Sequence, residues 1–155
     1  MVWPFQKKHP AREQLEIHES WKVGQGDYGG KVLIARFNAG LKEIAGHPEY
    51  PYQVGIAAPL REPTEQGLPT VDEDERLAVL EQQIAKVLED ARESLLVGVL
   101  TTGGMREFVF YTADAVAVRE KFERLRKSIS SHELQLMIHE DPGWHVYRQF
   151  IESYG

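Results

Sequence analysis

The chain has 155 residues, of which 42% are hydrophobic and 27% are charged, and its formal net charge is -6. This size and balance predict one globular domain with a substantial core, and the absence of cysteine excludes disulfides and thiolate metal sites. The acidic balance disfavours non-specific binding to nucleic acid or to an anionic membrane, because both depend on clustered Lys and Arg.

Residues 1–18 are predicted to form an arm, because they mix prolines, charges and Trp3 without a periodic pattern. No long apolar run follows their basic residues, so we predict neither a secretory signal nor a membrane span. We therefore expect a cytoplasmic protein in which residues 19–155 form a single α+β domain.

The domain begins with two predicted strands, over residues 20–25 and 31–37, joined by a glycine-rich turn. A helical turn over 41–45 precedes a third strand over 52–58, which has a proline on either side. Residues 60–71 then form a long loop, and loops of this length in compact domains are often functional or mobile.

A helix is predicted to begin after Thr70, whose hydroxyl can cap it while Glu73 completes a capping box. The acidic run over 72–75 suits the positive end of the helix dipole, so we interpret it as a helix start rather than as a cation site. Apolar residues then recur at helical spacing, at Leu77, Leu80, Ile84, Val87, Leu88 and Ala91.

Two apolar strands that meet at Gly103-Gly104 are predicted to form a β-hairpin, because this pair supplies the positive φ angles of a tight turn. Thr102 should face Met105, and outward steps should end with Val97 opposite Phe110. Alternation then assigns one face to the core, with Leu95, Val97, Val99, Phe108 and Phe110. The opposite face carries Leu96, Gly98, Leu100, Glu107, Val109 and Tyr111.

Asp114 is predicted to cap a second helix, whose apolar stripe is Ala115, Val118, Phe122, Leu125 and Ile129. A last strand over 132–140 should point Leu134, Leu136 and Ile138 toward the core. After Pro142-Gly143, the spacing of Trp144, Tyr147 and Ile151 predicts a short amphipathic helix that turns back over the sheet.

From residue 52 onward, the predicted order is strand, helix, strand, strand, helix, strand. This is the split βαβ, or ferredoxin-like, plan (βαββαβ), in which right-handed crossovers place both helices on one face of an antiparallel sheet. The N-terminal strand pair should extend this sheet, at an edge that the sequence does not assign.

The sheet face away from the predicted helices mixes apolar and small residues, so something should cover it. Three occupants fit this pattern: the C-terminal segment or the N-terminal arm acting as a second core, a protein partner or second copy of the chain, and a small molecule. The face carries Gln53, Gly55, Ala57, Leu96, Gly98, Leu100, Glu107, Val109, Tyr111, Gln135, Met137 and His139.

Solvent exposure accounts for most of the charged residues, but it explains two of them least well: Arg36, in an apolar strand, and Glu107, opposite Leu100. They could pair with each other or with Asp141, because charges that point inward are normally compensated. The strand over 106–111 invites comparison with RNA-recognition domains, but alternation turns its phenylalanines toward the helices, which disfavours nucleic-acid binding.

One cluster has residues suited to metal or acid–base chemistry: His139, Glu140, Asp141 and His145. A histidine at a strand end beside carboxylates is, however, more often a solvated pair. The sequence has no Gly-rich phosphate loop and no nucleophile elbow, so we assign no catalytic, cofactor-binding or metal-binding residue.

A series of short stretches follows one order along residues 20–150: Trp21, Arg36-Phe37-Asn38, Gly67-Leu68-Pro69, Val97-Gly98-Val99 with Thr101-Thr102, Gly104-Met105-Arg106-Glu107 with Tyr111, and Asp141-Pro142-Gly143-Trp144 with Tyr147. In this order they resemble a bacterial family known as domain of unknown function 695 (DUF695). The family has no assigned reaction, so the resemblance implies no catalytic residue. Related domains, similar in plan and in the terminal Trp-x-x-Tyr, resemble the type B protein regulator of ribonuclease E, a more acidic protein that binds its enzyme.

We therefore expect a protein-binding or regulatory module without a cofactor, which meets a protein partner or forms a homodimer. The candidate interaction face comprises Arg36, Leu100, Glu107, Val109, Tyr111, Met137, His139, Asp141, Trp144 and Tyr147. The alternative is a small-ligand-binding protein or hydrolase with a pocket under the 61–71 loop, using Arg36, Glu107, His139 and Asp141.

Overall fold

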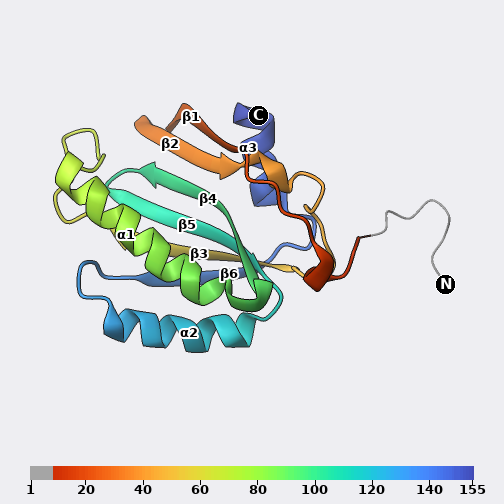
Figure 1. Cartoon of the computed structure of the whole chain (residues 1–155). Helices are drawn as coiled ribbons and strands as arrows, with labels where there is room; N and C mark the ends of the chain where they lie inside the picture. The colour runs from red at the N-terminus through yellow and green to blue at the C-terminus, as the bar shows by residue number, and fades with distance from the viewer. Residues whose placement is uncertain (1–8) are drawn as a thin grey trace.

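The computed structural model describes residues 9–155, which fold into a six-stranded antiparallel sheet with three α-helices (Figure 1). The predicted α+β class is therefore confirmed. Helices α1 (Val71–Leu88) and α2 (Ala115–Ser128) cover one face, and α3 (His145–Tyr154) lies beside β1 and β2. In sheet order the strands are β1 (Trp21–Tyr28), β2 (Lys31–Asn38), β4 (Ser94–Thr102), β5 (Met105–Thr112), β3 (Tyr52–Pro59) and β6 (Gln135–Glu140).

The N-terminal hairpin extends the sheet at the edge beside β4, a position that the sequence did not assign. Ala35 of β2 lies opposite Leu100 of β4, and β6 forms the other edge of the sheet next to β3. Both hairpin strands reach a two-residue turn at Gly29-Gly30, where φ is positive and Asp27 accepts a hydrogen bond from the Gly30 amide at 3.0 Å.

Residues 9–18 lie along the surface of the domain (Figure 1). Leu15 is buried, and its carbonyl accepts a hydrogen bond from the Arg92 guanidinium. The His47 ring contacts the Pro10 carbonyl at 2.7 Å. This part of the predicted arm is thus fixed to the domain, whereas residues 1–8, Trp3 among them, lie outside the described residues.

Helices α1 and α2 begin and end close to the residues that the sequence predicts. The Thr70 hydroxyl accepts a hydrogen bond from the Glu73 amide at 3.3 Å, and Asp114 accepts one from the Ala117 amide at 3.0 Å. Helix α1 ends before Ala91, which has a positive φ in a 3-10 turn. The helices pack on a core formed by Val54, Ile56, Leu77, Leu80, Ile84, Leu88, Leu96, Val99, Phe108, Phe110, Val118, Phe122, Leu125 and Leu134.

A β-bulge in β4 overturns part of the predicted face assignment. Pairing follows the prediction from Thr102 to Gly98, but Leu96 then lies opposite Phe110 instead of Val97. Because Val97 is an extra residue in the ladder, the alternation of faces reverses beyond it. Leu96 therefore faces the helices, while Leu95 and Val97 join the core under α3. The assignment of these three side chains from the sequence was wrong.

Helix α3 and the segments beside it form a second core on the other face of the sheet. The residues of this core include Leu15, Ala35, Phe37, Leu41, Ile44, Tyr50, Leu95, Val97, Val109, Tyr111, Trp144, Tyr147 and Phe150. Gly24 and Gly98 admit the helix closely, because a Cβ at these positions would lie 2.2 Å from the Tyr154 ring and 3.1 Å from the Phe150 ring. The C-terminal segment therefore covers much of the face that the sequence left open.

The last strand is shorter than predicted, since β6 begins at Gln135 rather than at residue 132. His132 instead turns inward, and its Nε2 lies 2.8 Å from the Glu73 carboxylate, with both side chains fully buried. Glu73 also accepts hydrogen bonds from the amides of Arg61 and Glu62, which ties the 60–70 loop to α1. Within residues 9–155, no helix is long and apolar enough to cross a membrane.

Candidate functional site

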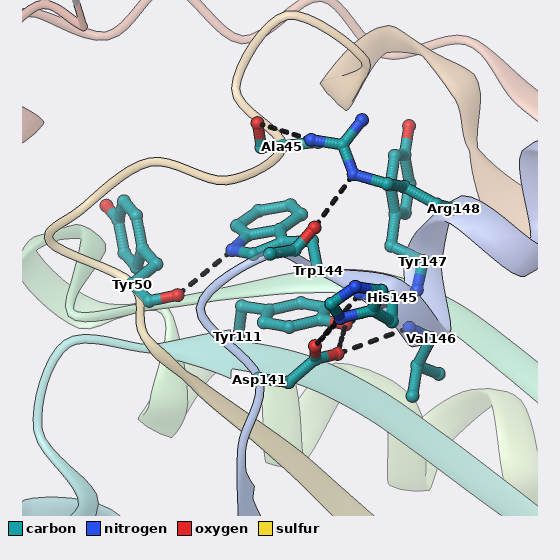
Figure 2. Close-up of polar contacts among 10 residues, drawn as sticks. Ala45, Tyr50, Tyr111, Asp141, Trp144, His145, Val146, Tyr147 and Arg148 are labelled. Carbon is teal, nitrogen blue, oxygen red and sulfur yellow. Dashed lines mark hydrogen bonds and ion pairs between the residues drawn. The ribbon is translucent and has the colours of Figure 1, made fainter.

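Asp141 anchors the start of α3 to the sheet (Figure 2). Its carboxylate accepts hydrogen bonds from the Tyr111 hydroxyl at 2.7 Å and from the amides of His145 and Val146 at 3.0 and 3.2 Å. Burial raises the pKa of Asp141, but the hydrogen bonds from Tyr111 and His145 outweigh it and hold that pKa below its usual value. Burial, together with the contact to Asp141, raises the pKa of Tyr111, so its hydroxyl stays protonated.

Trp144 fills the space between this anchor and the loop before β3. Its indole stacks on the Tyr111 ring at 4.1 Å, and its Nε1 donates a hydrogen bond to the Tyr50 carbonyl at 2.9 Å (Figure 2). The Tyr147 hydroxyl donates to the Asn38 carbonyl at 2.7 Å. Arg148 donates to the carbonyls of Gly143 and Ala45 at 2.7 and 3.3 Å. The polar groups around Asp141 and Trp144 are therefore used to hold α3 in place.

A groove of about 380 Å³ lies between α3 and the sheet, on the side away from Asp141. One face of α3, from Val146 to Tyr154, forms one wall, and the floor comes from β4, β5 and the end of the N-terminal hairpin. The residues that line it are Tyr28, Leu33, Leu100, Thr102, Met105, Glu107, Val146, Gln149, Phe150, Ser153 and Tyr154. This surface, together with Met137 on β6, is called the α3 groove below.

Glu107 is the charged side chain of the groove. Its carboxylate lies over Gly55, because a Cβ atom at position 55 would be 3.1 Å from the Glu107 Oε1. In β-sheet register, Gly55 lies between Val109 and Met137, so Glu107 reaches toward β6. Burial raises the pKa of Glu107, and the nearby His139 partly offsets this rise. The fold thus holds a carboxylate in a largely apolar setting.

Comparison with known protein families gives a match that covers most of the chain. A family model described as a family of unknown function, DUF695, matches residues 19–151. The chain belongs to the DUF695 family. A search of curated proteins finds no match.

The candidate interaction residues of this DUF695 domain fall into buried and accessible groups. Buried beneath or within the α3 layer are Val109, Tyr111, Asp141, Trp144 and Tyr147. Half-buried or exposed on the same sheet face are Leu100, Glu107, Met137 and His139. A partner that leaves α3 in place can reach only the second group.

Arg36 is separated from the other charges that the sequence grouped with it. Its guanidinium forms an ion pair with Glu81 of α1 and lies 4.9 Å from the centre of the Trp21 ring. It therefore points to the helix side of the sheet and pairs with neither Glu107 nor Asp141. Arg36, Glu107, His139 and Asp141 are not brought together around one pocket. Among residues 9–155, no group of three or more His, Asp or Glu side chains is placed to hold a metal ion.

Sequence reasoning missed several residues that line the α3 groove. Val146, Phe150 and Tyr154 recur at a spacing of four along α3, which is the signal of a second apolar stripe beside Trp144 and Tyr147. Met105, at the start of β5, also lines the groove because the Gly103-Gly104 turn brings it beside the end of α3.

A larger hollow of about 720 Å³ lies near the end of α2, and its basic residues are already paired. His132 contacts Glu73, Arg61 donates to the Ser131 carbonyl at 3.2 Å, and Arg126 forms an ion pair with Glu123 at 2.9 Å. The α3 groove is the better candidate for a binding site in this DUF695 domain, because it combines exposed apolar surface with a carboxylate that bonds to no other described side chain.

Proposed function

We propose that this DUF695 domain is a cytoplasmic protein-binding module whose partner docks along the α3 groove and over the adjoining face of β5, β3 and β6. The proposal rests on one observation. After α3 and the N-terminal segment have covered most of this sheet face, an apolar surface remains exposed beside them. Met137 is 59% exposed and Tyr28 is 71% exposed at its two ends. Exposed apolar surface of this kind commonly marks a protein interface.

The disposition of the polar groups supports binding rather than catalysis. Asp141, Tyr111 and His145 form a cluster that could resemble a catalytic arrangement, but their hydrogen bonds cap α3 and join it to β5. Domains related in plan resemble the type B protein regulator of ribonuclease E, which binds its enzyme, and that resemblance is in keeping with this role.

We also propose that the segment from β3 to β6 is a ferredoxin-like unit. Its elements follow the order β3-α1-β4-β5-α2-β6, and its strands lie in the order β4-β5-β3-β6 in the sheet. Helices on one face and a free opposite face are the usual consequence of this plan. Here α3 covers part of the free face, and the α3 groove is what remains.

Site-specific photo-cross-linking in the host cell tests the proposed interface. A photoreactive amino acid is placed at Met137, on the proposed surface, and at Val116, which is 67% exposed on α2. We expect one discrete protein adduct from position 137 and none of that mass from position 116. The same adduct should form with the purified partner, and Met105→Lys should abolish it while the circular dichroism spectrum stays native.

Three results would contradict the proposal. Identical adducts from both positions would show unspecific contact. An adduct that survives Met105→Lys would place the partner elsewhere. An adduct between two copies of the chain would assign the surface to self-association instead of to a separate partner.

A further inference from the structure

The α3 groove has a distinct charge pattern. Among the described residues that line it, Glu107 is the only one with an ionisable carboxylate or a cation, and its neighbours Leu100, Met105 and Val146 are apolar. Within residues 9–155, no side chain or backbone amide donates a hydrogen bond to the Glu107 carboxylate, and no ion pair involves it. The groove therefore presents one carboxylate that has no hydrogen-bonded or ion-paired partner among these residues, with His139 as its nearby charge-bearing neighbour.

We infer that the groove binds an apolar segment of another protein that carries one Lys or Arg, and that this cation pairs with Glu107. The inference rests on the proposed function and adds the chemistry of the partner. A half-buried carboxylate has lost part of its hydration, and a charge-assisted hydrogen bond from Lys or Arg compensates for that loss. The net charge of -6 would also attract a cationic partner from a distance.

The shape of the surface favours a protein segment over a small amine. Glu107 lies between two apolar regions: Phe150 and Tyr154 on the α3 side, and Met137 on the β6 side. A small ammonium ion would satisfy the carboxylate but leave both regions exposed to water. A segment with apolar side chains on either side of one Lys or Arg covers both regions and places the cation between them.

Peptide selection with the whole protein tests this inference. A displayed library of random 12-residue peptides is selected on the unmodified protein, and the bound peptides are eluted by excess free protein. Peptides are retained if their affinity for Met105→Lys is reduced, because this change places an ammonium on the same strand face two residues from Glu107. The matched control is Val116→Lys, which adds the same charge on α2 and should leave binding unchanged.

We expect the retained peptides to carry apolar residues around one Lys or Arg. For a synthetic peptide of this set, Glu107→Gln should weaken binding about tenfold, which is the loss of one charge-assisted hydrogen bond. Replacement of the peptide's Lys by norleucine should weaken binding by a similar factor. The two changes together should cost no more than either one alone, because they break the same contact.

Three results would overturn the inference. If Met105→Lys abolishes binding but Glu107→Gln does not weaken it, the groove binds apolar segments without a charge requirement, and only the proposed function stands. If no selected peptide is sensitive to Met105→Lys, both the inference and the docking surface fail. If sedimentation shows a dimer that Met105→Lys dissociates, the occupant is a second copy of the chain.

Discussion

Replacement of Trp144 by alanine is the sharpest test of how α3 is held. The indole is fully buried, stacks on Tyr111, and donates a hydrogen bond to the Tyr50 carbonyl. Truncation of a buried Trp to Ala costs about 3–5 kcal/mol, and it would leave the buried Tyr50 carbonyl without its donor. We therefore expect a loss of about 4 kcal/mol, which lowers the Tm by roughly 8–16 °C for a domain of this size.

The assay is urea unfolding followed by far-UV circular dichroism, together with a thermal melt. Trp144→Phe keeps an aromatic ring against Tyr111 but removes the hydrogen bond, so it should cost about 1–2 kcal/mol. Val116→Ala changes an exposed side chain on α2 and should stay within about 0.5 kcal/mol of the unmodified protein. If Trp144→Ala melted within about two degrees of the unmodified protein, our account of the second core would be refuted.

Three further changes give distinct signatures. Asp141→Asn should destabilise the protein at neutral pH, and the deficit in unfolding free energy should shrink as the pH falls below about 4. This follows because the folded protein lowers the pKa of Asp141, so its contribution is present above the unfolded pKa and is lost in acid. Glu107→Gln should raise the Tm at neutral pH, and the gain should fade as the pH drops through the raised pKa of Glu107, since protonation removes the same cost. Glu73→Ala should cost about 3 kcal/mol in urea unfolding, because it leaves His132 and two loop amides without their acceptor; a loss below about 1 kcal/mol would contradict that role.

Most of the elements could be predicted from the sequence, because their signals are local. Thr70 and Asp114 cap their helices, and the Gly103-Gly104 turn sets the register of the hairpin next to it. The β-bulge at Val97 could not be predicted in this way. Residues 95–97 are all large and apolar, so no polar residue marks which of them faces which core. The bulge is compatible with the sequence because both faces of β4 are buried.

The contacts of the charged residues depended on tertiary structure. Arg36 was expected to pair with Glu107 or Asp141, but it meets Glu81 because β2 joins the sheet beside β4 and one of its faces lies near α1.

The spacing of Trp144 and Tyr147 correctly indicated an amphipathic helix. The sequence did not reveal that Trp144 would pack on Tyr111 while Phe150 took the place above Gly98. These choices follow from the direction in which the chain turns at Pro142-Gly143.

The methionines Met105 and Met137 offer the most direct measurement of the central claim, that the α3 groove is a docking surface. Met105 lines the groove, and Met137 is its exposed neighbour on β6. A methyl-¹³C-methionine spectrum gives one signal for each, assigned by single Met→Leu changes. On titration with a selected peptide or the cross-linked partner, the signals of both Met105 and Met137 should shift. A partner that binds while the signals of Met105 and Met137 both stay fixed would contradict the account.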